Sequence, residues 1–184
     1  MKYQAVVVMN HKGVIGKDGY VPYNLPYDLT QLRRITSYTP CVMGRKTYEE
    51  ISSSREKYPL RRIETGRRLM VLTSNASAYN NLPELCFVES YEECKDLLKT
   101  YTKTKPNKGT DWRTVTIWGG ASIYDQFYDD LDSIWLTIAN QNVENPDTFF
   151  PRKLRIGEQW EIDRYPISRP GESCNCEFYR MKRK

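Results

Sequence analysis

The sequence predicts an α/β fold with a mixed, largely parallel sheet, and three observations support this prediction. Strand-like and helix-like segments alternate over the first two thirds of the 184 residues. The last two strand-like segments follow each other with no helix between them, which predicts an antiparallel hairpin at one edge of the sheet. No linker or internal repeat divides the chain, so we expect a single domain over residues 1–184.

The strand-like segments are short apolar runs bounded by turn residues. They cover residues 4–9, 41–43, 68–73, 86–89, 114–118, 133–140, 160–164 and 176–182. The helix-like stretches cover residues 25–37, 46–52, 91–99 and 122–128. Asn24 is the expected N-cap of the first helix, and Pro26 lies in its first turn. The expected long loops are residues 52–66 and 101–112.

The composition is that of a soluble globular protein, with 39% hydrophobic and 28% charged residues. Because no apolar run approaches the ~20 residues needed to span a bilayer, we expect no membrane segment. The five cysteines are scattered and odd in number, and the chain has one histidine. These counts argue against a zinc site and indicate free thiols in a reducing cytoplasm.

The net charge of +5 is concentrated in two places. Residues 53–68 carry six basic and two acidic residues, and the last five residues, RMKRK, carry four basic ones. One basic loop suggests a small polyanionic ligand, whereas a nucleic-acid-binding protein more often has a broad basic stripe. A solvated loop that keeps the protein soluble remains an equal alternative.

A first strand-to-helix turn has the composition of a phosphate site. It lies in VMGRKTYEEI, residues 42–51, where Gly44 permits a close backbone approach. The next three residues, Arg45, Lys46 and Thr47, begin a helix whose dipole attracts anions at this end. An ordinary strand-to-helix turn has the same composition, so both interpretations stay open.

A second turn repeats this pattern in VTIWGGASIYDQF, residues 115–127, where a buried strand runs into Gly119-Gly120 and a helix that begins near Ser122. Such a turn can bind pyrophosphate, although paired glycines also serve tight packing. A third strand ends in LTSN, residues 72–75, with hydroxyl and amide groups suited to another phosphate contact. Because a dinucleotide carries several phosphates, the repeated turns favour a dinucleotide ligand.

The sequence has no motif for a catalytic nucleophile. It lacks the phosphate-loop lysine motif, the G-x-S-x-G elbow and the H-E-x-x-H zinc motif. The single histidine, His11, is expected in a surface loop. We therefore expect a bound cofactor to supply the chemistry.

Asp28 is the unusual residue of the first helix. At 100° per residue it lies at about 300° from Leu25, between Leu32 and Ile35 on the apolar face. An acid in the first turn commonly complements the helix dipole. That role does not require the apolar face, where a carboxylate is costly to desolvate without a partner. A ligand edge with two adjacent N–H donors would be such a partner.

Taken together, these stretches resemble the signature stretches of dihydrofolate reductases. They are, in order, VIGKDGYVPYNLPYDL, VMGRKTYEEI, WGGASIYDQF and LTIANQNVENPDTFFP. The resemblance implies a mixed, mainly parallel, eight-stranded central sheet flanked by about four helices, with a C-terminal antiparallel hairpin. It also implies an adenosine-binding lobe over roughly residues 39–112.

The resemblance further implies an enzyme that reduces 7,8-dihydrofolate to 5,6,7,8-tetrahydrofolate with NADPH, in support of one-carbon and thymidylate metabolism. Hydride would pass to carbon 6 of the pterin, and a proton from water would reach nitrogen 5. The expected partners are dihydrofolate, NADPH and antifolate inhibitors. We expect a cytoplasmic monomer that binds no metal, membrane or nucleic acid.

By the same resemblance, Asp28 matches the acid that binds the pterin and serves catalysis, with Thr137 hydrogen-bonded behind it. Arg67 matches the arginine that takes the α-carboxylate of the glutamate tail. The other implied substrate-binding residues are apolar and contact the rings: Val6, Val8, Leu29, Leu32 and Ile51.

The implied cofactor-binding residues form three groups. The nicotinamide side comprises Val8, Trp118 and Tyr124, with Ile15, Gly16 and Val21 from a mobile loop. The adenosine-side phosphates would be contacted by Gly44, Arg45, Lys46, Thr47 and Ser74, which would favour NADPH over NADH. The pyrophosphate turn comprises Gly119, Gly120, Ala121, Ser122 and Ile123.

Three other interpretations stay open at this point. A related reductase of the same fold, acting on an aminopyrimidine of the riboflavin pathway, would not need LPYDL or Arg67. A basic module that binds RNA or DNA through residues 53–68 and 180–184, with several tyrosines, would not need the Gly-Gly turn. A relative without activity is a third interpretation, because Tyr23 stands where many members of the family have tryptophan.

Overall fold

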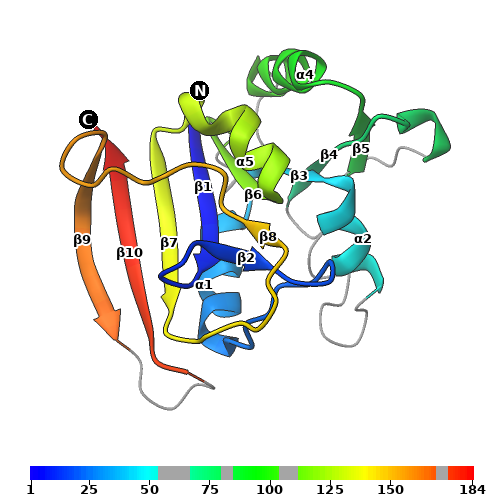
Figure 1. The fold of residues 1–184 in the computed structure, drawn as a ribbon. Helices are drawn as coiled ribbons and strands as arrows, with labels where there is room; N and C mark the ends of the chain where they lie inside the picture. The colour runs from blue at the N-terminus through cyan, green and yellow to red at the C-terminus, as the bar shows by residue number, and fades with distance from the viewer. Residues whose placement is uncertain (54–66, 80–84, 104–111, 169–173) are drawn as a thin grey trace.

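The central feature of the structure is one sheet of eight strands, in the order β5-β4-β3-β6-β1-β7-β10-β9 (Figure 1). The structure is a computed structural model that describes residues 1–53, 67–79, 85–103, 112–168 and 174–184. The strands are β1 (Lys2–Met9), β3 (Pro40–Gly44), β4 (Arg68–Leu72), β5 (Leu85–Val88), β6 (Thr114–Gly119), β7 (Ser133–Ala139), β9 (Trp160–Ser168) and β10 (Cys176–Arg183).

The sheet is mixed in the predicted way. Strands β5, β4, β3, β6, β1 and β7 all pair in parallel, whereas β10 is antiparallel to both β7 and β9. The predicted α/β class, the eight-stranded sheet and the C-terminal antiparallel hairpin are therefore confirmed. In a parallel sheet the carboxyl ends of neighbouring strands lie at one edge, which is where ligands bind in α/β proteins.

Four α-helices lie in the described ranges: α1 (Pro26–Thr36), α2 (Arg45–Ser53), α4 (Tyr91–Lys103) and α5 (Ala121–Phe127). The side chains of β1 alternate between the two faces of the sheet, as in any strand. Tyr3, Ala5 and Val7 belong to the main core with side chains of α4 and α5, and Val8 packs with residues beside α1. Helix α2 contributes Tyr48 and Ile51 to a separate core over β3, β4 and β5.

The start of α1 differs from the prediction. The N-cap is Leu25 and not Asn24, and no side chain caps the helix. The reason is Pro26, which begins the helix and forces the preceding residue out of the helical region, so that Leu25 has φ −123° and ψ 88°. The helix still runs close to its predicted length.

A second, two-stranded sheet was not predicted. It pairs β2 (Val14–Gly16) with β8 (Thr148–Phe149), which are 3 and 2 residues long. Segments this short have no measurable sequence period. The two short strands place the segment before α1 next to residues near 148.

Two sequence-based expectations concern segments that are only partly described. Most of the basic segment 53–68 and most of the expected loop 101–112 lie outside the described residues. Within the described ranges, no helix is long and apolar enough to cross a bilayer.

Candidate functional site

A cleft of about 610 Å³ opens where β3, β4 and β6 end. Helix α1 contributes Asp28, Leu29 and Leu32 to its lining, and α2 contributes Thr47 and Ile51. One wall of the cleft is therefore largely apolar, and the other contains a polar strand-to-helix turn. Ligand sites at the carboxyl edge of a sheet typically combine such surfaces.

Asp28 lies in the first turn of α1 and is half-buried. The hydroxyl of Thr137 in β7 donates a hydrogen bond of 2.5 Å to its Oδ1. Thr137 itself is buried, so it holds the carboxylate from behind while Asp28 faces the cleft. A carboxylate fixed this way can accept two parallel hydrogen bonds from a planar ligand edge.

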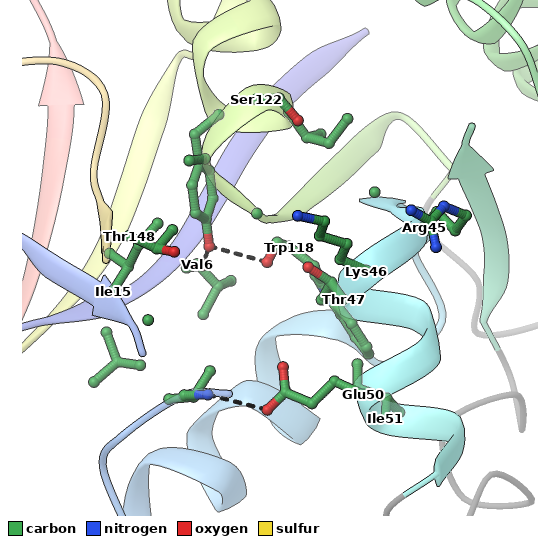
Figure 2. A pocket seen from close by; sticks show the side chains of 18 of the residues that line it. Val6, Ile15, Arg45, Lys46, Thr47, Glu50, Ile51, Trp118, Ser122 and Thr148 are labelled. Atoms are coloured by element: carbon green, nitrogen blue, oxygen red, sulfur yellow. Dashed lines mark hydrogen bonds between the residues drawn. The ribbon is translucent and has the colours of Figure 1, made fainter. Parts of the chain in front are cut away.

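Tyr124 of α5 connects the glycine turn to the central strand. Its hydroxyl lies 2.7 Å from the carbonyl oxygen of Val6 and 3.0 Å from that of Trp118 (Figure 2). Burial raises the pKa of Tyr124 above its ordinary value, and the negative charge of Asp28 raises it further. The hydroxyl therefore stays protonated at neutral pH and remains a hydrogen-bond donor.

Glycines let side chains pack directly against the backbone around this turn. Gly119 has φ +95°, and a Cβ there would lie 2.6 Å from the ring of Tyr124. A Cβ on Gly44 would lie 3.1 Å from Ile123. A Cβ on Gly120 would meet only Thr47 Oγ1, at 3.5 Å, so the space beside Gly120 opens into the cleft. This open cradle fits the pyrophosphate of a dinucleotide.

The start of α2 presents cations at the same end of the cleft. Arg45 Nη1 lies 2.9 Å and 2.7 Å from the two carboxylate oxygens of Glu49. This contact lowers the pKa of Glu49. Lys46 is exposed, and Ser74 follows β4 at the edge of the cleft. These groups could bind the adenosine-side phosphate of NADPH.

Arg67 lies deep at the opposite end of the cleft and is 7% exposed. Its Nε donates to Thr36 Oγ1 over 2.9 Å, and its Nη2 donates to the carbonyl oxygen of Arg33 over 3.2 Å. Its guanidinium carbon lies 5.8 Å from the ring centroid of Trp118. Burial lowers the pKa of Arg67, so a ligand carboxylate would be a favourable neighbour for its charge.

The cleft brings together nearly all the site residues that the sequence predicted. Gly119 and Thr137 do not line it: Gly119 lies beneath the ring of Tyr124, and Thr137 lies behind Asp28. The residues predicted for the cofactor and substrate that do line it are Val6, Val8, Ile15, Gly16, Val21, Asp28, Leu29, Leu32, Gly44, Arg45, Lys46, Thr47, Ile51, Arg67, Ser74, Trp118, Gly120, Ala121, Ser122, Ile123 and Tyr124.

Other lining residues were not predicted. They include Tyr20, Arg33, Glu50, Glu89, Gln126 and Thr148. Three of them had a usable signal in the sequence, because Glu50 lies three residues after Thr47, Arg33 four after Leu29 and Gln126 four after Ser122, each on one helix face with a predicted site residue. Thr148 is brought to the cleft by the short pair β2–β8, which no sequence period indicates.

The fold and the cleft define an α/β protein whose cleft, with its open glycine turn and its cationic helix start, fits a dinucleotide. The sequence matches the family model for dihydrofolate reductase over residues 2–183. It is 27% identical to dihydrofolate reductase of Haemophilus influenzae over the full length of both chains. It is 30% identical to dihydrofolate reductase type 3 of Salmonella typhimurium, over 100% of this chain and 99% of that protein.

A solved structure of dihydrofolate reductase from Enterococcus faecalis, complexed with NADP(H) and RAB-propyl, is also similar. Its TM-score is 0.74 at 25% identity, over 100% of this chain and 96% of that one. The chain belongs to the dihydrofolate reductase family and is an NADP-dependent oxidoreductase.

Proposed function

We propose that this chain reduces 7,8-dihydrofolate to 5,6,7,8-tetrahydrofolate with NADPH, and that Asp28 is the acid that holds the pterin. The observation that carries the assignment of Asp28 is its hydrogen bond to Thr137 on the wall of a cleft that also contains the glycine turn. Membership of the family supports the reaction.

The pterin is bound at the apolar end of the cleft. The two oxygens of Asp28 accept hydrogen bonds from the 2-amino group and the neighbouring ring nitrogen, an arrangement that is strong because it is bidentate and charged. Thr137 fixes the orientation of the carboxylate. The rings lie among the apolar lining residues Val6, Val8, Leu29, Leu32 and Ile51.

Arg67 binds the α-carboxylate of the glutamate tail. Its bonds to Thr36 and to the carbonyl of Arg33 hold the guanidinium in place before the ligand arrives. A charge that is already oriented and partly desolvated binds a carboxylate more strongly than an exposed one does.

NADPH would be held by the residues of the two strand-to-helix turns and, when bound, would supply the hydride. Gly120 and the residues after it, Ala121, Ser122 and Ile123, hold the pyrophosphate. Arg45, Lys46, Thr47 and Ser74 hold the adenosine-side phosphates, within an adenosine-binding lobe over roughly residues 39–112. The residues that would hold the nicotinamide end line the same cleft: Ile15, Gly16, Val21, Trp118 and Tyr124.

Asp28 also assists the chemistry. Its negative charge favours a protonated pterin ring, and water admitted at the cleft mouth delivers the proton to nitrogen 5. Hydride transfer needs donor and acceptor atoms in near contact, and the side chains on the two walls of the cleft would hold the two ligands against each other.

The direct test is NADPH oxidation with dihydrofolate, for the protein and for Asp28→Asn. We expect activity in the unmodified protein and a loss of two or more orders of magnitude in the variant, because the amide lacks the charge and one acceptor. Asp96→Asn, an exposed acid on α4 that pairs with Lys99, is the matched control and should retain full activity. Equal rates for all three would refute the role of Asp28.

The same proposal covers the other expected properties. Antifolate inhibitors compete with dihydrofolate for Asp28, and the protein is a monomer in the cytoplasm. None of the five cysteines forms a disulfide, which suits a reducing compartment. Size-exclusion chromatography with light scattering measures the oligomeric state directly.

A further inference from the structure

Glu50 forms a contact across the mouth of the cleft. It lies in the middle of α2, and its Oε1 accepts a hydrogen bond of 3.1 Å from the backbone N–H of Val21 (Figure 2). Glu50 and Val21 both line the cleft, but they belong to separate walls. Val21 lies in the segment of residues 17–24 between β2 and α1, which we name the cleft loop.

The base of the cleft loop is fixed on one side. Lys17 and Tyr20 exchange two backbone hydrogen bonds of 2.9 Å, which close a tight turn containing Asp18 and Gly19 at positive φ. The backbone N–H of Asp18 donates to Asp147 Oδ2 over 2.8 Å. These contacts hold the first half of the loop against the segment that contains β8.

The second half of the cleft loop is held from the opposite direction, by α2. Val21 is 37% exposed, and the next residues lead into α1 past Pro22. Proline has no N–H, so Val21 is the last residue of this stretch that can donate to α2 before Tyr23 becomes buried. The contact with Glu50 therefore joins the loop to the wall that carries Thr47 and Ile51.

We propose that Glu50 is a positioning residue that latches the cleft loop to α2 and so controls ligand exchange at the nicotinamide end of the cleft. This inference rests on the proposed cofactor site. A hydrogen bond between a carboxylate and a backbone N–H at a half-exposed position is strong enough to bias the loop and weak enough to open repeatedly. Both entry and exit of ligand pass through the open state.

The test measures NADPH association and dissociation by stopped-flow fluorescence. Glu50→Ala removes the acceptor, so both rate constants should rise, by about three- to tenfold, while the dissociation constant changes less. Glu50→Gln keeps a weaker acceptor and should give intermediate rates. A residue that only contacts the ligand would change dissociation and leave association unaltered.

The direction of the change in the NADPH dissociation rate distinguishes the latch from a simple electrostatic effect of Glu50. NADPH is a polyanion, so the loss of a nearby negative charge by itself would slow its dissociation. Glu92→Gln, an exposed acid on α4, controls for the change in net charge and should leave both rates unaltered.

A double-mutant cycle identifies the donor. Val21→Pro removes the N–H, so Glu50→Ala should have no further effect in that background. Unchanged or slower dissociation in Glu50→Ala alone would overturn the latch, whether or not Val21→Pro folds. If the unmodified protein gave no NADPH signal, the proposed cofactor site itself would fail, which is a different result.

Discussion

At the scale of single residues, the site depends on buried polar side chains that orient charged ones. Thr137 orients Asp28, and Thr36 orients Arg67. Both threonines are buried, so their hydroxyls have no competing water. The charged groups consequently face the cleft in fixed positions, and little ordering remains to be done when a ligand binds.

Thr137→Val tests this orientation. The change keeps the shape of the side chain and removes the hydroxyl, so Asp28 loses one hydrogen bond and part of its alignment. We expect the KM for dihydrofolate to rise by about 5- to 30-fold, which corresponds to roughly 1–2 kcal/mol, while the KM for NADPH stays the same. Thr100→Val, an exposed position on α4, is the control. A parallel rise in both KM values would contradict the assignment.

At the scale of elements, the turn between β6 and α5 depends on a position that only glycine fits. Gly119→Ala would place a methyl group 2.6 Å from the ring of Tyr124 and force a side chain into positive φ. We expect a loss of about 2–4 kcal/mol in the free energy of unfolding. Tyr124 should also move away from the carbonyl of Val6, which weakens NADPH binding.

Urea unfolding with and without NADPH measures both effects. The comparison is Gly157→Ala, which also has positive φ but no atom within 4 Å of its Cβ. That variant should lose about 1 kcal/mol from backbone strain alone. Equal losses in the two variants would mean that the ring of Tyr124 moves without cost.

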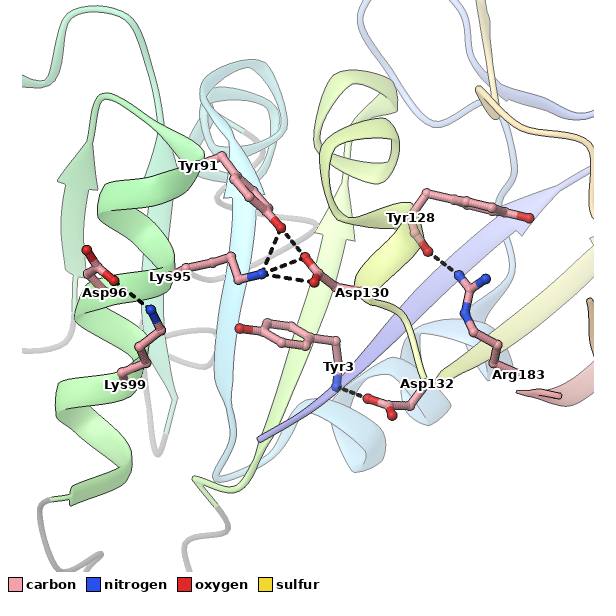
Figure 3. A network of polar contacts seen from close by, with 9 residues as sticks. All are labelled: Tyr3, Tyr91, Lys95, Asp96, Lys99, Tyr128, Asp130, Asp132 and Arg183. Carbon is pink, nitrogen blue, oxygen red and sulfur yellow. Dashed lines mark hydrogen bonds and ion pairs between the residues drawn. The ribbon is translucent and has the colours of Figure 1, made fainter.

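Helix α4 packs Cys94 and Leu98 into the main core and also takes part in a charged cluster (Figure 3). Lys95 lies 2.9 Å from Asp130 Oδ1 and donates to the hydroxyl of Tyr91 over 2.9 Å. Tyr91 also donates to Asp130. The same helix carries a second pair, Lys99 and Asp96, which is much more exposed. The two pairs allow a comparison of how much a partly buried and an exposed ion pair contribute to stability.

Lys95→Met should lower the free energy of unfolding by about 1–2 kcal/mol, because Asp130 is left partly buried with one partner fewer. Lys99→Met should change it by less than about 0.5 kcal/mol, because an exposed pair contributes little. Urea unfolding of both variants gives the comparison. A larger loss of unfolding free energy for Lys99→Met than for Lys95→Met would show that burial does not determine how much these pairs stabilise the protein.

At the scale of the whole molecule, the core should make the protein sensitive to alkali. Burial raises the pKa of Cys41 and of Cys94 from 9.0 to about 12. Between pH 9 and 12 the unfolded chain releases protons that the native state keeps. The free energy of unfolding therefore falls as pH rises through this window, by about 1.4 kcal/mol per pH unit for each thiol.

Urea unfolding at pH 8 and pH 10.5, with a reductant present, measures this slope. Buried Tyr3 and Tyr23, whose pKa values are raised to about 12, add to it above pH 10. The double variant Cys41→Ala/Cys94→Ala should be less stable at pH 8 but should lose stability less steeply with pH. An unchanged slope would show that neither thiol is protected in the native state.

The sequence by itself determined the class of fold, most elements and both glycine turns, because these depend on local patterns. The apolar runs of the strands, the period of α1 and the paired glycines are each readable within a dozen residues. The position of Asp28 on the apolar face of α1 was likewise readable from its helix alone.

Only the tertiary structure decided which distant groups meet. The resemblance implied that Thr137 lies behind Asp28, and the structure gives the physical reason: β7 pairs with β1 beside α1, which brings together two residues that are 109 positions apart. The pair β2–β8, the N-cap at Leu25 and the contact between Glu50 and Val21 were not predicted. Each of these three features depends on a short segment or on a bond between separate elements. Such features produce no periodic pattern in the sequence.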